Sequence, residues 1–251
     1  MLTKDIAICI RTVDYSETSQ IVTFFTRAAG RINAIAKGSK RPKSSFGGTI
    51  EMFSCGNIVF TDPGREKLST LTEFEPINTD ECCRLPQNNL FALNCCFFAA
   101  ELLNKFTQDY DPHPALFDDF LQYLHNIGTV ETKNNALILL ILFQLQLLQQ
   151  VGLQPILNFC ANCKTRYEPP AANNEIYFSS SANGVICRDC QGTFPDKIKL
   201  SQSAAACLSD LKQLAQAQEN TLCEIENILI VHYTELLGQP PKMAKYFKFK
   251  N

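Results

Sequence analysis

Four cysteines in two matching pairs are the feature that most constrains the fold of this chain. The motif C-A-N-C begins at Cys160, and the motif C-R-D-C begins at Cys187, with 23 residues between the two. Two such turns can bring four thiolates around one zinc ion, with two ligands from each turn. The intervening segment 175–187 reads as a hairpin that returns the second pair to the first. The sequence therefore predicts one zinc ion in a zinc-binding module over residues 158–195, with the ligands Cys160, Cys163, Cys187 and Cys190.

Four sulfur ligands favour a closed, structural site without an open position for water. The alternatives are four core cysteines or two disulfides. The first 14 residues lack the basic lead and apolar core of a secretory signal, so we expect a cytoplasmic, reducing location, where disulfides are rare. The other eight cysteines lack the paired spacing and are expected in the core: Cys9, Cys55, Cys82, Cys83, Cys95, Cys96, Cys207 and Cys223.

The first 78 residues have the texture of a small β-barrel. Five short runs rich in Ile, Val, Thr and Phe are separated by turns, and the last two runs are joined by the turn signature T-D-P-G. Five such strands are the number in an OB-fold barrel. The predicted strands are 5–13, 20–26, 31–37, 50–60 and 67–75.

Positive charge is concentrated in the barrel segment. Residues 18–50 contain six cations and no acid, although the whole chain has a formal net charge of −2. The end of the chain after Leu236 is also basic and free of acids. A basic face of this kind is typical of a protein that binds a polyanion, and the simpler alternative is a solvated surface.

Alternation within the third strand suggests where a nucleic acid would bind. Ile32, Ala34 and Ala36 point to one face of the strand, whereas Arg31 and Lys37 point to the other. Further cations follow in the loop after the strand. An OB barrel builds its groove from such a face and its loops. The predicted DNA-binding residues are Arg31, Lys37, Lys40, Arg41 and Lys43, extended by Arg65 and Lys67 at the last hairpin. Phe24, Phe25, Phe46 and Phe53 could stack on bases, although a core position is the better interpretation.

After Pro76 the hydrophobic pattern becomes helical. In the first predicted helix, Leu90, Leu93, Phe97 and Ala100 share one stripe. The third is apolar all round and should end at a capping Gly152, but its apolar run is far shorter than a bilayer requires. The helices are predicted at 87–106, 114–127, 132–151, 201–217 and 222–237, in a helical domain split between 79–157 and 196–251, after an OB domain at 1–78.

The order of these parts, together with several local segments, resembles the RecO family of bacterial recombination mediators. The segments that carry the resemblance are 16–17, 20–48, 101–103, 114–117, 143–160, 177–190 and 237–247. The resemblance implies an OB domain, a helical domain and a zinc module. It also implies binding of single- and double-stranded DNA, annealing of complementary strands, and assistance to RecA loading together with RecR and the single-stranded-DNA-binding protein, in the bacterial cytosol and on the nucleoid during repair.

Two positions depart from the pattern of that family. Lys164 follows the second cysteine, and Asn183-Gly184 precedes the third, where the family usually has Gly and Gly-Gly. Asn tolerates a left-handed backbone, so the second change is mild. Lys164 is expected to affect the turn of the first cysteine pair.

The sequence therefore favours a DNA-binding mediator that catalyses no reaction. A zinc-dependent hydrolase or nuclease is the enzymatic alternative, but the three histidines are scattered and no H-E-x-x-H or G-x-x-x-x-G-K-[ST] motif occurs. A non-catalytic scaffold whose barrel binds protein partners is the other alternative.

Overall fold

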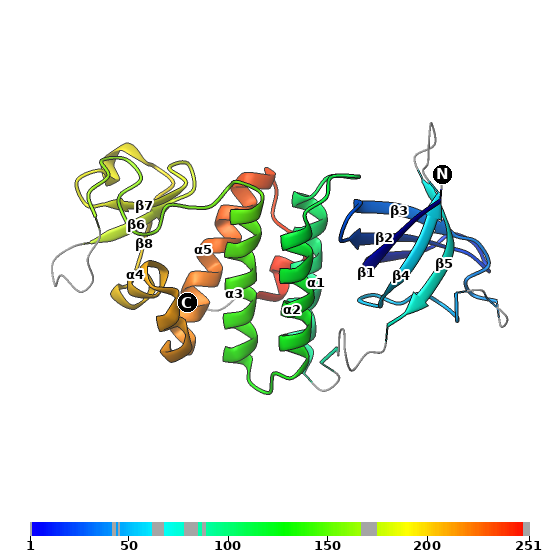
Figure 1. Cartoon of the computed structure of the whole chain (residues 1–251). Helices are drawn as coiled ribbons and strands as arrows, with labels where there is room; N and C mark the ends of the chain where they lie inside the picture. Colours follow the sequence, from blue (N-terminus) through cyan, green and yellow to red (C-terminus); the bar gives the residue numbers. More distant parts are fainter. Residues whose placement is uncertain are drawn as a thin grey trace. The chain divides into compact units, whose positions relative to one another are not determined.

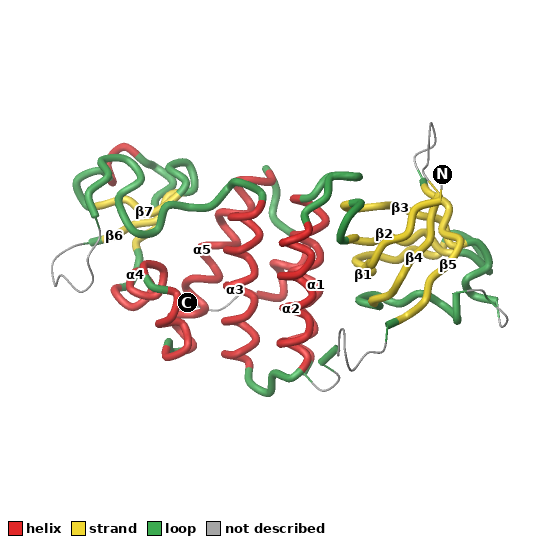
Figure 2. Tube along the Cα trace, in the orientation of Figure 1, coloured by secondary structure: helices red, strands yellow, loops and turns green. Residues whose placement is uncertain are grey.

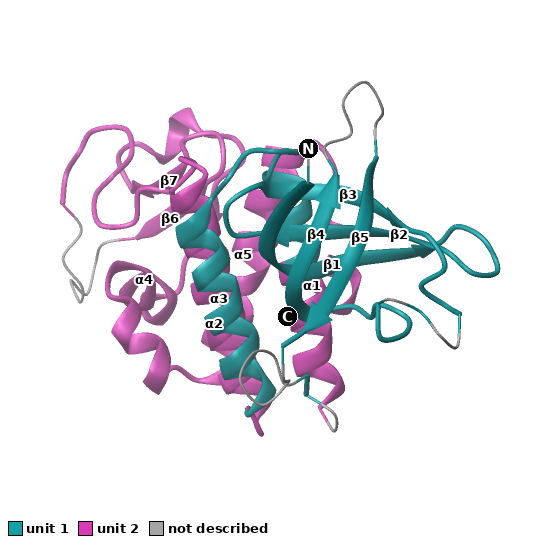
Figure 3. Ribbon diagram, turned by 45° about the vertical axis from the view of Figure 1, so that its right-hand side comes forward, with its two compact units in different colours: residues 1–88, 100–129 teal, residues 89–99, 130–251 magenta. Residues whose placement is uncertain are grey.

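The computed structural model describes residues 2–41, 44, 46–61, 68–77, 85–86, 89–166 and 175–247. Three predicted DNA-binding residues, Lys43, Arg65 and Lys67, lie outside these ranges, as do Cys82 and Cys83. The chain forms two compact units, residues 1–88 with 100–129 and residues 89–99 with 130–251 (Figure 3). The domain limits predicted from sequence divide the chain differently and stay a prediction.

The first unit contains a closed five-stranded barrel in the order β1-β2-β3-β5-β4 (Figures 1 and 2). All neighbouring strands are antiparallel except β3 and β5, which are parallel. This closure confirms the predicted OB-type barrel. The strands are β1 (Leu2–Asp14), β2 (Gln20–Thr26), β3 (Gly30–Ala36), β4 (Cys55–Thr61) and β5 (Ser69–Pro76).

The barrel core follows the alternation seen in the sequence. In β3, Ile32, Ala34 and Ala36 are fully buried, while the residues between them are partly exposed. Phe24 of β2 and Phe74 of β5 stack inside the barrel with ring centroids 5.9 Å apart. The inward face of β3 is therefore apolar, as the period of two predicted.

The predicted strand 50–60 is wrong at its start, because β4 begins only at Cys55. Phe53 has a φ of 65°, and a left-handed residue of this kind interrupts an extended backbone. Its N–H donates to Cys9 O at 2.8 Å, and Ser54 N–H donates to Glu51 O at 3.2 Å, so these residues form a turn beside β1. Phe53 remains buried there.

Helix α2 (Pro114–Gly128) packs against the barrel within the first unit. Phe117 of α2 lies against Phe25 of β2, with ring centroids 6.0 Å apart. Proline begins the helix, where its missing N–H has no helical partner to lose. Phe25 therefore holds a helix and is not available to a ligand.

The second unit is built around helices α3 (Lys133–Gln150) and α5 (Glu219–Leu237). Thr132 caps α3 by accepting a hydrogen bond from Asn135 N at 3.2 Å, and Gly152 follows the helix with a φ of +76°. This confirms the predicted glycine end. Across the described residues, every helix is too short or too polar to cross a membrane.

Two helical predictions are wrong in detail. Leu90 begins α1 (Leu90–Phe106) but is 73% exposed, and the buried face of α1 instead includes Ala92, Cys95 and Ala99. The predicted helix 201–217 is divided into α4 (Gln202–Ser209) and a 3-10 helix (Leu211–Gln216). Asp210 separates them with an extended backbone and accepts a hydrogen bond from Lys212 N at 3.2 Å, since an Asp side chain competes with helical bonding.

A small sheet in the order β7-β6-β8 carries the cysteine pairs. Strands β6 (Ile176–Ser179) and β7 (Gly184–Cys187) form the predicted hairpin. Strand β8 (Ile198–Lys199) pairs with β6 and leads into α4, where Ser201 accepts the capping hydrogen bond from Ala204 N at 3.1 Å. Phe178 of β6 lies edge-on to the ring of His232 on α5, with centroids 5.3 Å apart. The hairpin is therefore packed on the helices of the second unit.

A buried carboxyl group lies between α3 and α5. Glu226 is fully buried and accepts one hydrogen bond, from Gln144 Nε2 at 3.0 Å. In the described part of the chain, Glu226 Oε2 and Gln144 Oε1 have no hydrogen-bond partner. Burial raises the pKa of Glu226 from 4.5 to about 8, although the bond from Gln144 opposes this change. The group therefore keeps its proton at neutral pH, and a protonated carboxyl can donate where a carboxylate cannot.

Glu226→Gln is expected to change the pH dependence of stability. The carboxyl titrates at 4.5 in the unfolded chain and at about 8 in the folded chain, so folding takes up a proton between these values. Its contribution to the free energy of unfolding therefore falls as the pH rises through this window and is constant above it. Gln cannot ionise, so the variant should be more stable than the parent at pH about 9, by on the order of a few kcal/mol. Urea unfolding across this range measures the difference.

Glu235→Gln is the matched control, because Glu235 is exposed on the same helix. This control should follow the parent at every pH. Parallel curves for the parent and Glu226→Gln would contradict the expectation.

Candidate metal centre and nucleic-acid interface

Tight backbone turns form both cysteine pairs. Lys164 N–H donates to Cys160 O at 2.9 Å in the first turn, and Cys190 N–H donates to Cys187 O at 3.1 Å in the second. Ala161 N–H donates to Val185 O of β7 at 2.8 Å, which fixes the first turn to the hairpin. The hairpin thus carries the second pair back to the first, as the spacing predicted.

The four sulfur atoms converge. The Sγ atoms of Cys160, Cys163, Cys187 and Cys190 all lie within 4.8 Å of one another. Cys163 Sγ and Cys187 Sγ are 3.7 Å apart, and a tetrahedral ion with sulfur at about 2.3 Å places its ligands roughly 3.8 Å apart. The four cysteines form no disulfide. Cys163 is exposed, which also argues against a purely core role. The cluster therefore fits one metal ion with four sulfur ligands.

Hydrogen-bond donors surround the sulfur atoms. Cys187 N–H lies 3.4 Å from Cys160 Sγ, and Asn162 Nδ2 lies 3.3 Å from Cys190 Sγ. The Thr165 hydroxyl is 3.2 Å from Cys163 Sγ. This hydrogen bond makes the largest contribution to lowering the pKa of Cys163 to about 6. Burial instead raises the pKa of Cys187 to about 12. The donors favour the thiolate form, which binds a metal, at Cys160, Cys163 and Cys190, whereas burial opposes it at Cys187.

The two departures from the family pattern both adopt the backbone that glycine would favour. Lys164 has a φ of 64° and Asn183 a φ of 51°. A left-handed backbone is unfavourable for Lys. The Lys164 side chain nevertheless stabilises the turn, because its Nζ donates a hydrogen bond to Ala161 O at 2.8 Å. Gly184 allows close packing, because a Cβ there would lie 2.3 Å from Ile156 O. The first turn thus forms with Lys164 in a left-handed backbone conformation, and the effect of this residue on the turn stays a prediction.

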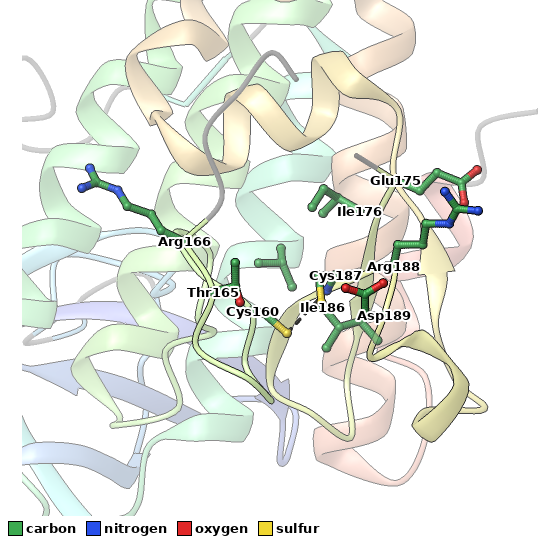
Figure 4. A pocket seen from close by; sticks show the side chains of 10 residues that line it. Cys160, Thr165, Arg166, Glu175, Ile176, Ile186, Cys187, Arg188 and Asp189 are labelled. Carbon is green, nitrogen blue, oxygen red and sulfur yellow. Dashed lines mark hydrogen bonds between the residues drawn. The ribbon is translucent and has the colours of Figure 1, made fainter. Parts of the chain in front are cut away.

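A pocket of about 260 Å³ lies beside the sulfur cluster, between the first turn and the β6–β7 hairpin (Figure 4). Arg166 and Arg188 line it from different segments, and Arg188 lies near Glu175. Glu175 forms an ion pair with Lys199. The hydrogen bond from Lys199 makes the largest contribution to lowering the pKa of Glu175. Charges of both signs line the pocket, so it has no uniform field that would select an anion or a cation.

Arg31 of β3 is held by the chain that follows α1. Its Nε donates to Asp109 Oδ1 at 2.6 Å, and its Nη1 donates to the backbone and side-chain oxygens of Asn104. Asn33 Nδ2 donates to Asp109 Oδ2 at 3.1 Å. Next to them, Gly30 has a φ of +73°, and a Cβ at this position would lie 2.3 Å from Asp111 O. Arg31 therefore has a structural role that the sequence did not reveal.

The loop after β3, residues 37–41, is called the basic loop below. Its Lys40 forms an ion pair with Asp14 at 2.5 Å, and the Lys40 side chain is 23% exposed. Lys37 and Arg41 are exposed, and within the described ranges neither forms an ion pair. Of the four predicted cations that the structure describes, Arg31 and Lys40 are thus paired, while Lys37 and Arg41 face solvent without an ion pair.

The phenylalanines considered for base stacking are all in the core. Phe24, Phe25, Phe46 and Phe53 are between 0% and 4% exposed. None of these rings can reach a nucleic acid in this conformation. This agrees with the core position favoured from sequence.

Among the described residues, the cysteine quartet is the one group of three or more His, Cys, Asp or Glu side chains placed to hold a single metal ion. His113 is paired with Asp111 at 3.2 Å, and His232 is buried against Phe178. The three histidines therefore join no metal cluster in this part of the chain.

These features define a multidomain protein that combines an OB-type barrel and helices with a four-cysteine module able to hold a metal ion. The family model for the N-terminal part of recombination protein O matches residues 1–79, and the model for its C-terminal part matches residues 87–245. The chain belongs to the RecO family of DNA repair and recombination proteins.

Curated relatives cover nearly the whole chain. A DNA repair protein RecO of Bacillus pumilus is 32% identical over 253 residues, which cover 98% of this chain and 93% of the relative. The Bacillus subtilis protein of the same name is 30% identical, with 98% and 94% covered. That of Rhodopirellula baltica is 33% identical over 238 residues, with 95% and 82% covered.

Arg31→Ala is expected to weaken the first unit. The substitution removes a charged hydrogen-bond network and leaves Asp109 without that partner, which should lower the free energy of unfolding by about 1 to 3 kcal/mol. Lys37→Ala is the matched control, because Lys37 is an exposed cation one residue after the same strand, and it should change stability by at most about 0.5 kcal/mol. Urea unfolding measures both, and equal stability of the two variants would contradict the role of Arg31.

Proposed function

We propose that this protein binds single- and double-stranded DNA through the OB-type barrel, as a mediator in DNA repair that catalyses no reaction. The observation that carries the proposal is the exposure of Lys37 and Arg41 on the basic loop of a RecO-family barrel. OB barrels use strand faces and loops of this kind to bind nucleic acids. Contacts to phosphate oxygens carry no sequence information, so binding should depend little on sequence.

The charge distribution supports this proposal. Ion pairs already neutralise Arg31 and Lys40, so among the predicted DNA-binding cations that the structure describes, Lys37 and Arg41 keep a free positive charge. A DNA strand at these residues would release condensed counterions, which makes affinity fall with salt. Lys43, Arg65 and Lys67 remain proposed DNA contacts from sequence. For Arg31, we propose a supporting role at this face.

Strand annealing would follow from the same charge. Two complementary strands repel each other, and a shared basic surface screens that repulsion. As in the family that the chain belongs to, the proposed partners are RecR and the single-stranded-DNA-binding protein, with assistance to RecA loading. The proposed location is the bacterial cytoplasm, at the nucleoid during repair.

For the metal site, we propose one structural zinc ion bound by Cys160, Cys163, Cys187 and Cys190. Zinc accepts four thiolates in tetrahedral geometry, and the sulfur separations fit that arrangement. Four protein ligands leave no position for a reacting water. The ion would hold two turns to one hairpin and thereby stabilise the module.

Removal of the unpaired cations should weaken DNA binding. The double variant Lys37→Ala/Arg41→Ala is expected to lower affinity for a single-stranded oligonucleotide. It should also reduce the slope of log affinity against log salt by about 1.4, since each lost phosphate contact removes about 0.7. Fluorescence anisotropy across a salt series measures both quantities.

Arg27→Ala is the control for charge alone. Arg27 belongs to the same acid-free segment but is paired with Asp118 at 2.8 Å, so its removal should change the salt slope less. Unchanged affinity and slope in the double variant would exclude the basic loop as the DNA site.

Zinc content and folding should be lost together. We expect one equivalent of zinc by elemental analysis of the purified protein, and its loss in Cys160→Ser with Cys187→Ser. The second unit of this double variant should then unfold at lower urea concentration. Cys207→Ser is the control, because this buried cysteine lies outside the quartet. Full zinc content without the two ligands would contradict the assignment.

A further inference from the structure

An aromatic side chain is exposed in the loop between β1 and β2. Tyr15 is 62% exposed, and its neighbour Val13 is 43% exposed. Core phenylalanines fill the barrel, so this ring contributes little to its packing. A single exposed aromatic is common on protein surfaces. Its meaning here depends on what lies next to it.

Backbone hydrogen bonds hold this loop in a turn. Tyr15 N–H and Ser16 N–H both donate to Ser19 O, at 3.0 and 3.2 Å. A turn of this kind holds the Cα of Tyr15 in place, so the ring is presented from a defined position. The entropy that a stacking partner would have to remove is therefore mainly that of the side chain.

The same loop is joined to the basic loop by three contacts. Lys40 N–H donates to Thr18 O at 3.1 Å, and Gly38 N–H donates to Ser19 Oγ at 3.2 Å. The third contact is the ion pair of Lys40 with Asp14, the last residue of β1, at 2.5 Å. The loop that carries Tyr15 therefore lies next to the basic loop, which carries the exposed Lys37 and Arg41.

Charges of both signs lie on the two adjoining loops. Lys40 pairs with Asp14 of β1, Glu17 is the acid within the β1–β2 loop, and Lys37 and Arg41 are the exposed cations of the basic loop. In the basic loop, the Arg41 side chain lies beside Gly38, since a Cβ on Gly38 would be 3.5 Å from Arg41 Cδ. Gly38 has a φ of +77°, so glycine serves this turn and leaves room for the arginine.

We propose that Tyr15 is a stacking platform for an unpaired base of single-stranded DNA whose phosphates lie at the basic loop. This inference rests on the proposed DNA binding and adds a preference to it. Every base has a π face, so stacking on an aromatic ring tolerates any sequence. Bases within a duplex are already stacked on each other, so the ring adds affinity for single strands and little for duplexes.

Truncation of the ring tests the proposal. Tyr15→Ala is expected to reduce affinity for an oligothymidylate by roughly 5- to 150-fold, and Tyr15→Phe should keep near-parent affinity because stacking needs the ring and not the hydroxyl. For an abasic oligonucleotide of equal length, the parent and Tyr15→Ala should bind alike. For a duplex, they should differ little. Tyr246→Ala is the control, because Tyr246 is 52% exposed in the other unit.

A spectroscopic reporter gives a second measurement. The chain contains no tryptophan, so Tyr15→Trp introduces a unique indole. Stacking of thymine on this indole should quench its fluorescence when oligothymidylate binds, whereas the abasic strand should bind with little quenching.

The outcomes separate this inference from the proposed function. If the parent binds none of the three DNA probes at low salt, the proposed function fails and this inference fails with it. If the parent binds and Tyr15→Ala binds oligothymidylate equally well, the stacking role alone is overturned. An equal loss on the abasic strand, or an equal loss in Tyr246→Ala, would also overturn it. Circular dichroism of each variant confirms that the barrel is folded.

Discussion

The attachment of strand β3 on both of its faces is the constraint on which the proposed DNA surface depends. Its inner side chains close the barrel core, while Arg31 and Asn33 on the outer face are bound by Asp109. Gly30 lets the backbone near Asp111 approach to a distance that no Cβ would allow. The last residues of β3 are also paired with both β2 and β5, and the basic loop leaves from this fixed end. The paired strand thus positions the exposed charges that a ligand would meet.

The cysteine module must be stabilised in another way, because it is small. Its sheet has only three short strands, so it buries little apolar surface of its own. Four converging sulfurs compensate if an ion joins them, because the ion links the first turn to the hairpin. The left-handed backbone at Lys164 is strained for a side chain of this type, whereas Asn183 tolerates it. Metal binding would offset that strain, which connects the fold of the module to the chemistry of its ligands.

Local patterns predicted much of this architecture, and failed where side chains from distant segments decided the outcome. The alternation of β3 and the spacing of the quartet are local periodicities, and both were confirmed. The stripe that includes Leu90 was wrong, because α1 has more than one apolar face and its packing partners select the buried one. At Phe53, contacts with β1 determine the backbone of the turn. The break at Asp210 is an exception, because it is a local effect of the Asp side chain, which accepts a hydrogen bond from Lys212 N.

The sequence alone determined the kind of protein: a barrel with concentrated positive charge, a helical part, and four cysteines spaced for one ion. Those properties depend on residue type and on spacing, and both can be read from the sequence without knowledge of the fold. Only the tertiary structure decided which cations are free, because Arg31 is neutralised by Asp109 and Lys40 by Asp14. It also showed that Tyr15 is exposed, a ring that the sequence did not single out. These ion pairs join residues that are far apart in the chain, so no local pattern encodes them.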